Sequence, residues 1–232
     1  DEGADKNLRG QALYALAQDP SQITAILDRL EPLAKANREF DLAPGLGSAI
    51  YRNLASIRER KEPEPAWAER AAALGMEIAL DTARPLAGRS DGIKLYAFAA
   101  GPRSAEKLEA FINDEKLDPE LRSAAAAMII IDPETKIFVM MAGKYDTLPR
   151  PVRQALGSAA SRAAKAPGAE AFLIRFLKDD DIELESRFSV LNQLGLFGAA
   201  TQIAALKELE NHPRIGSVVR GVIERIENRR KQ

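Results

Sequence analysis

The chain has 232 residues, no cysteine, and a near balance of 33 Lys and Arg against 34 Asp and Glu. The lack of cysteine excludes disulfides, thiolate zinc sites and cysteine nucleophiles, and the balanced charge argues against a general nucleic-acid binder, whose phosphate contacts need surplus cations. Apolar residues make up 46% of the chain but aromatics only 6%, a composition that favours helix-on-helix packing over a sheet core. No apolar run approaches the roughly 20 residues that span a bilayer.

The first half of the chain predicts helices arranged in loose pairs. Asp19-Pro20-Ser21 separates the first two, because aspartate can cap a helix and proline suits the first helical position. Further along, the two prolines of Lys61–Pro65 cannot lie inside one helix, so this segment is a loop between two longer helices. That longer pair occupies residues 42–84 and departs from the period of the second half. The expected helices span residues 8–17, 23–34, 46–60, 66–83, 93–100 and 105–112.

A helix-turn-helix pattern recurs about every 31 residues through the second half. Leu121, Val152, Leu184 and Ile215 each open a new helix, at steps of 31, 32 and 31 residues. A fixed period of this size marks a helical solenoid, in which each helix pair buries its apolar face only against its neighbours. The regular repeats are expected at 118–148, 149–180 and 181–212, with a capping helix over 213–230.

The clearest helix start in the chain is Asp118-Pro119-Glu120. Aspartate can cap, proline suits the first position, and glutamate favours the positive end of the helix dipole. Asp132-Pro133-Glu134 repeats this arrangement in the following turn. We therefore predict an all-α fold, a right-handed α-solenoid of about six helix pairs plus a C-terminal capping helix, forming one domain over residues 1–232.

Two of the three regular repeats share parts of a motif of Asp-Pro-Glu, an apolar-Arg pair and an alanine-rich helix. It is carried by Asp118 to Ala125, Ile131 to Glu134 and Pro151 to Leu156, whereas Leu184-Glu185 departs from it, with Arg187 as the nearest arginine. In these residues the chain resembles HEAT-type repeats, especially the short bacterial variety related to phycobilisome-lyase repeats. The resemblance implies an armadillo-like helical fold. It also implies a scaffold that binds other proteins along a concave ridge of second helices, although a few such proteins are enzymes, enzyme accessories or DNA glycosylases.

Ile137 to Met141 are five consecutive apolar residues on the expected second helix of the 118–148 pair. A helix buried along one stripe does not need all five. The run is therefore either a core helix enclosed by both neighbours or a partly exposed Met/Phe patch that receives a partner. Helix-in-groove or extended-segment docking on the second helices would centre on this region and on the following repeat. The candidate binding residues are Phe138, Met141, Lys144, Tyr145 and Arg175.

Four basic residues, Arg9, Lys94, Arg122 and Arg153, occupy positions that the repeat pattern makes equivalent. They predict either a basic ladder that grips an acidic ligand or, as the family pattern favours, structural pairing with an acidic turn residue of the same or adjacent repeat.

His212 is the only histidine, and it lies in an expected turn. A zinc site or a general base needs further ligands or a supporting partner, so we expect a solvated turn residue. Lys178 to Glu183 is the densest acidic run; it lacks the glycine and spacing of a calcium loop. We therefore interpret it as a turn whose last aspartate caps the next helix. No catalytic residue, metal ion or cofactor is expected.

The sequence thus predicts a non-enzymatic module that binds a protein or peptide, with no nucleic acid expected and no membrane span. The alternatives are a DNA-binding or DNA-repair module of the HEAT type, or an accessory domain of a larger enzyme. The chain starts at Asp1-Glu2-Gly3 without a methionine, an acidic start common after a signal-cleavage site, which favours the periplasm or cell envelope over the cytoplasm.

Overall fold

The computed structural model describes residues 6–38, 44–129, 141–164 and 169–229. Within these ranges every regular element is a helix and none is a strand, so the prediction of an all-α chain is confirmed. The chain divides into two compact units, unit 1 over Asp1–Ile131 and unit 2 over Asp132–Gln232. None of the described helices is long and apolar enough to cross a membrane. A single array over the whole chain stays a prediction.

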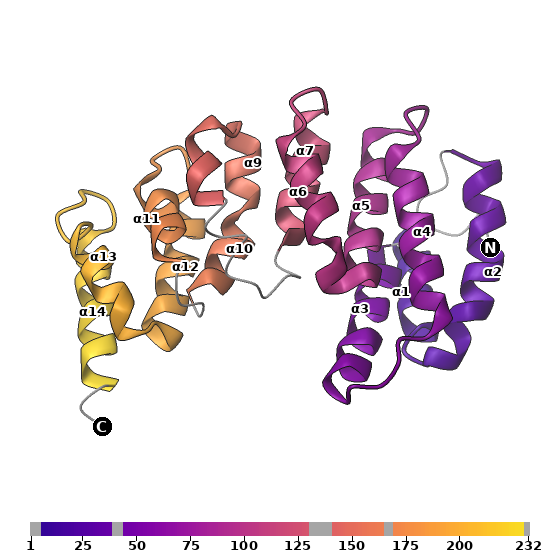
Figure 1. Cartoon of the computed structure of the whole chain (residues 1–232), viewed down its shortest axis with the longest axis horizontal. Helices are drawn as coiled ribbons and strands as arrows, with labels where there is room; N and C mark the ends of the chain where they lie inside the picture. The colour runs from indigo at the N-terminus through magenta and orange to yellow at the C-terminus, as the bar shows by residue number, and fades with distance from the viewer. Residues whose placement is uncertain (1–5, 39–43, 130–140, 165–168, 230–232) are drawn as a thin grey trace. The chain divides into compact units, whose positions relative to one another are not determined.

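Unit 1 contains α1 (Lys6–Leu16), α2 (Ile23–Ala36), α3 (Pro44–Glu59), α4 (Ala66–Leu80), α5 (Leu86–Ala100), α6 (Ala105–Asn113) and α7 (Pro119–Met128). Its helices lie in two rows. In the first row α1 packs on α3, α3 on α5 and α5 on α7, while in the second row α2 packs on α4 (Figure 1). Stacked helix pairs pack in this way, because each pair buries its apolar face against the next. The pair within residues 42–84 is therefore a member of the stack with longer helices.

Unit 2 contains α9 (Arg150–Ala155), α10 (Gly157–Ala163), α11 (Glu170–Lys178), α12 (Leu184–Phe197), α13 (Ile203–Lys207) and α14 (Gly216–Arg229). Residues 141–144 are also helical and lead into a short 3-10 turn over Tyr145–Thr147. Here too the first-row helices α10, α12 and α14 pack in sequence, and α11 packs on α13 in the second row (Figure 1).

The backbones of α4 and α5 approach closely through two glycines. A Cβ atom added to Gly75 would lie 2.5 Å from the amide nitrogen of Tyr96. One added to Gly92 would lie 2.7 Å from both the amide nitrogen of Ala79 and the carbonyl oxygen of Gly75. Both distances are too short for any side chain. Glycine is therefore required at these two positions by helix packing, because both residues lie inside helices with ordinary helical backbone angles.

Some helix limits follow the sequence prediction and others do not. Asp118 caps α7 as expected, its carboxylate accepting the Glu120 N–H at 2.8 Å. However, α5 begins at Leu86, seven residues before the predicted start at 93 (93 − 86). The helix expected over 152–164 is divided at Leu156, whose N–H is shared between the carbonyls of Val152 and Arg153. Gly157, a poor helix former, follows directly.

A recurring turn follows the second helix of four pairs. Its first residue accepts the N–H of the residue two positions later: Asp81 from Ala83, Asp114 from Lys116, Asp179 from Asp181 and, through its imidazole, His212 from Arg214. Asp81 and Asp114 are 33 residues apart, as are Asp179 and His212 (114 − 81 and 212 − 179).

An arginine eight positions after each of these turn residues completes the pattern. Its guanidinium donates to a carbonyl ten residues earlier, in the last turn of the preceding helix or, for Glu210, in the turn that follows α13. Carbonyls at helix ends lack an intrahelical partner, and the helix dipole favours cations there. The bonds are Arg89 to Ala79 (3.0 Å), Arg122 to Ile112 (2.9 Å), Arg187 to Leu177 (3.4 Å) and Arg220 to Glu210 (2.6 Å). We call this turn and its arginine the turn–arginine signature.

Candidate functional site

The helix pair between two that keep the turn–arginine signature departs from it. Tyr145 stands at the turn position, because its carbonyl accepts the N–H of Leu148 three residues later, as those of Asp114 and Asp179 accept from Leu117 and Ile182. Arg153 follows eight residues later, but it donates to Asp179, Asp181 and the Leu148 carbonyl instead of to a carbonyl ten residues earlier. Real proteins tend to break their local rules at functional sites, so this departure marks a candidate functional region.

Gln154 points forward to the next pair rather than back to its own. Its Nε2 donates to Ser186 Oγ at 2.8 Å, and its Oε1 accepts the backbone N–H of Glu183 at 3.0 Å. Gln154 therefore joins two consecutive pairs of unit 2 at the start of α12.

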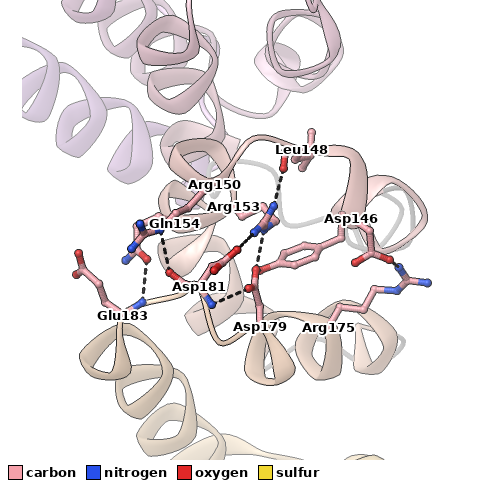
Figure 2. Close-up of polar contacts among 10 residues, drawn as sticks. Asp146, Leu148, Arg150, Arg153, Gln154, Arg175, Asp179, Asp181 and Glu183 are labelled. Carbon is pink, nitrogen blue, oxygen red and sulfur yellow. Dashed lines mark hydrogen bonds and ion pairs between the residues drawn. The ribbon is translucent and has the colours of Figure 1, made fainter.

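Arg153 crosses the same boundary (Figure 2). Its Nε donates to Asp179 Oδ2 at 2.7 Å, its Nη2 to Asp181 Oδ2 at 2.7 Å and its Nη1 to the Leu148 carbonyl at 2.8 Å. All three guanidinium nitrogens are engaged, which is the arrangement that holds a planar cation in one orientation. Arg153 thus ties the turn after residue 144 to the acidic turn after α11.

Tyr145 forms the floor of this region. The ring is only 2% exposed, and it packs edge-on against Phe172 with 6.2 Å between ring centroids, while the Arg153 guanidinium lies 5.9 Å from its centre. Its hydroxyl donates to Asp179 Oδ2 at 3.0 Å. Burial, followed by the charge of Asp179, raises the pKa of Tyr145 well above its ordinary value. The hydroxyl is therefore held as a hydrogen-bond donor.

Arg153 stays charged in this setting. Burial acts to lower its pKa, but the hydrogen bond and charge of Asp179 outweigh that effect and leave the pKa raised.

An open hollow of about 380 Å³ lies over Tyr145. Its remaining lining residues are Asp146, Arg153, Arg175, Lys178 and Asp179. Arg153 and Asp179 are largely buried and bonded to each other, whereas the side chains of Arg175 and Lys178 on α11 remain 43% and 48% exposed. The site therefore has a buried, internally bonded polar floor and a partly exposed, charged rim.

Of the five predicted binding residues, the structure brings two to this hollow, Tyr145 and Arg175. Phe138 lies outside the described residues. Met141 is 1% exposed, so its side chain belongs to the core and does not form the exposed patch that the sequence left open. Tyr145 lines the hollow, although its side chain is almost fully buried. Lys144 is exposed but does not line the hollow.

In the predicted basic ladder, Arg122 and Arg153 lie at equivalent helix positions, four residues after the N-caps Asp118 and Pro149, but they bond to different partners and Lys94 is out of register. Arg122 bonds back to its own pair, whereas Arg153 bonds forward, and Lys94 pairs with Asp91 within α5 while Arg89 takes the equivalent role. The side chain of Arg9 is outside the described part. The pairing of Arg153 with the acidic turn agrees with the structural alternative. The turn–arginine signature is the feature that sequence reasoning missed, although the Asp and Arg eight residues apart were visible in the sequence.

The aspartates of the acidic run 178–183 bond to residues of both the preceding and the following helix pair. Asp179 and Asp181 accept from Arg153, whereas Asp180 accepts from Arg187 at 3.0 Å and lies 3.8 Å from His212. Its last aspartate does not cap α12, whose N-cap is Glu183 without a side-chain bond. His212 is mostly buried at this turn rather than solvated, because Asp180 and the Arg214 backbone contact it. In the described ranges, no group of three or more acidic or histidine side chains is placed to hold a metal ion.

A larger hollow of about 540 Å³ lies in unit 1 between the ends of α2 and α4. Its cations are paired, as are Arg175 and Lys178 in unit 2: Lys35 with Glu77, Arg38 with Asp81, and Arg84 with the carbonyls of Ala34 and Arg38. Arg38, which lines this hollow, is the last described residue before the gap at 39–43. The unit 2 hollow is therefore the better-defined candidate.

Comparison with known proteins adds no further constraint, since no family model, no curated protein and no solved structure matches this chain.

Proposed function

We propose that the chain is a non-enzymatic interaction module, an α-solenoid that binds a segment of another protein on the second-row helices of unit 2. The binding surface is the hollow over Tyr145, with α11 as its rim. The observation that carries this proposal is a coincidence of position. The hollow opens at the one pair, among three consecutive ones, in which Tyr145 takes the turn position of the turn–arginine signature and Arg153 bonds forward to Asp179 and Asp181.

The division between floor and rim supports binding of a partner. Arg153, Asp179 and the Tyr145 hydroxyl satisfy one another, so they supply a rigid frame rather than reactive groups. Arg175 and Lys178 stand on the rim with long, partly exposed side chains that can change partner at little cost. A rigid frame with an adaptable rim favours recognition.

The size of the hollow supports a peptide-like ligand. A volume of about 380 Å³ is at the small end of the usual range of ligand pockets, about 300–1,000 Å³. It suits one or two side chains of a segment that extends along the second-row helices, as in known modes of peptide recognition.

Site-directed photo-cross-linking tests the proposal. A photoreactive phenylalanine analogue placed at Ala171, exposed on α11 one turn before Arg175, should give a protein adduct in native extract. The matched control is Ser189, exposed on α12 in the first row. Adducts from position 171 that are absent from position 189 would support the proposal. Equal labelling from both positions, or adducts to nucleic acid only, would refute it.

A further inference from the structure

We infer that the hollow of unit 2 binds an acidic peptide segment through Arg175 and Lys178, and that Asp146 and Glu208 occupy these two cations when no ligand is bound. This inference rests on the proposed function, and it adds the chemistry of the partner and the means by which the free site is kept charge-balanced.

The two cations lie on one face of α11. Residues three apart on a helix are neighbours, so Arg175 and Lys178 can both reach a ligand that lies along the rim. Arg175 bonds to Asp146 through Nη1 alone, and its other guanidinium nitrogens have no acceptor among the described residues. A carboxylate that binds two nitrogens of one guanidinium is held more strongly and with more defined geometry. Arg175 therefore has capacity for a ligand carboxylate.

The two internal carboxylates come from the pairs on either side of α11. Asp146 belongs to the preceding turn and is 75% exposed, and Glu208 follows α13 and is 58% exposed, with its Oε2 2.7 Å from Lys178 Nζ. Ion pairs this exposed contribute little to stability and exchange readily. A ligand carboxylate can take their place, because the displaced side chains return to water.

Arg153, in the same hollow, forms ion pairs that a ligand is not expected to displace. Its partners Leu148, Asp179 and Asp181 use all three guanidinium nitrogens, and its side chain and that of Asp179 are largely buried. Leaving a buried charge without its partner is strongly unfavourable. The ligand charges are therefore met by the rim cations and not by Arg153.

The inference makes opposite predictions for the two kinds of rim residue. Arg175→Gln removes a ligand contact and should weaken binding of an acidic peptide. Asp146→Asn removes a competitor and should tighten it by about two- to fivefold, the range expected for an exposed ion pair. Glu185→Gln removes the same charge from an exposed position on α12, outside the hollow. It should therefore leave the affinity nearly unchanged, as a control for net charge.

The experiment uses the whole chain with Ala171→Cys, which can be labelled specifically with an environment-sensitive fluorophore because the chain has no cysteine. The probes are a short capped peptide in which glutamates flank a leucine, and the same peptide with glutamines or with lysines. The expected result is saturable binding of the glutamate peptide, tighter with Asp146→Asn and weaker with Arg175→Gln.

Other outcomes separate the inference from the proposed function. If the glutamine peptide binds the hollow as tightly, the hollow still binds peptides but the acidic partner is wrong. If Asp146→Asn changes affinity no more than Glu185→Gln, the role of Asp146 as a competitor is wrong. Preference for the lysine peptide, or no response to any probe, overturns the inference, and the cross-linking experiment then decides the proposed function separately.

Discussion

A single methyl group added to α5 should have opposite effects at two glycines of the same helix. Gly92 is buried against α4, where a Cβ would lie 2.7 Å from both the Ala79 nitrogen and the Gly75 oxygen. Gly88 is the matched control, because a Cβ there meets no atom within 4 Å. Gly92→Ala should therefore destabilise unit 1, and Gly88→Ala should stabilise it.

The magnitudes follow from two competing effects. Replacing glycine by alanine in a helix contributes about 0.5–1 kcal/mol of stability, mainly through the lost freedom of the unfolded chain. At Gly88 this contribution stands alone. At Gly92 the methyl group meets backbone, which cannot rotate away, and overpacking of this kind costs about 1–3 kcal/mol. The net expectation is a loss of about 1–2 kcal/mol at Gly92 and a gain below about 1 kcal/mol at Gly88.

Denaturant unfolding followed by circular dichroism measures both effects, with the midpoint compared at constant slope. The two variants have the same composition, so any difference between them reports position alone. If Gly92→Ala is as stable as Gly88→Ala, the two helices are not in backbone contact at this crossing, and the packing described for α4 and α5 is wrong.

Three further predictions concern unit 2. Gly221→Ala, in the interior of α14 with no atom within 4 Å of the added Cβ, should stabilise the chain by about 1 kcal/mol, as measured by urea unfolding. Asp179→Asn should cost about 2–4 kcal/mol in the same assay, because it removes the buried one of the two carboxylates that pair with the largely buried Arg153; a loss no larger than that of the exposed Asp181→Asn would contradict this. The pKa of Tyr145 is raised in the folded state, so the stability linked to its protonation is complete below about pH 10 and falls above it, by up to about 1.4 kcal/mol per pH unit. Unfolding measured between neutral and alkaline pH should show this slope in the wild type and lose it in Tyr145→Phe; equal slopes in the two proteins would mean that the pKa of Tyr145 is not raised by burial and by Asp179.

The parts of the fold that the sequence predicted depend on local chemistry. The Asp118-Pro119 start of α7 was predictable because capping uses residues that are adjacent in the sequence. The start of α5 at Leu86 was missed, since Gly88 and Gly92 within the helix resemble a loop. Gly92 is retained for its contact with α4, which only the tertiary structure shows.

The candidate site was predictable only in outline. The repeat pattern predicted that the site lies on the second-row helices and includes Arg175. The same pattern aligns Arg153 with Arg122, but the two arginines have different hydrogen-bond partners. Apolar residues such as Met141 have the same appearance in the sequence whether they face the core or a partner, and the structure places this one in the core. The role of Gln154 depends on contacts with Ser186 and Glu183, 32 and 29 residues later, and no local rule reports these.

The central claim is that the unit 2 hollow is the surface that receives a partner. The most direct test is an amide correlation spectrum of the isotope-labelled chain, recorded during titration with the glutamate–leucine peptide. We expect the shifted amides to lie in residues 145–148 and 171–179, with fast exchange and saturation. Shifts confined to unit 1, or to the first-row helices α12 and α14, would contradict the claim and place the binding surface elsewhere.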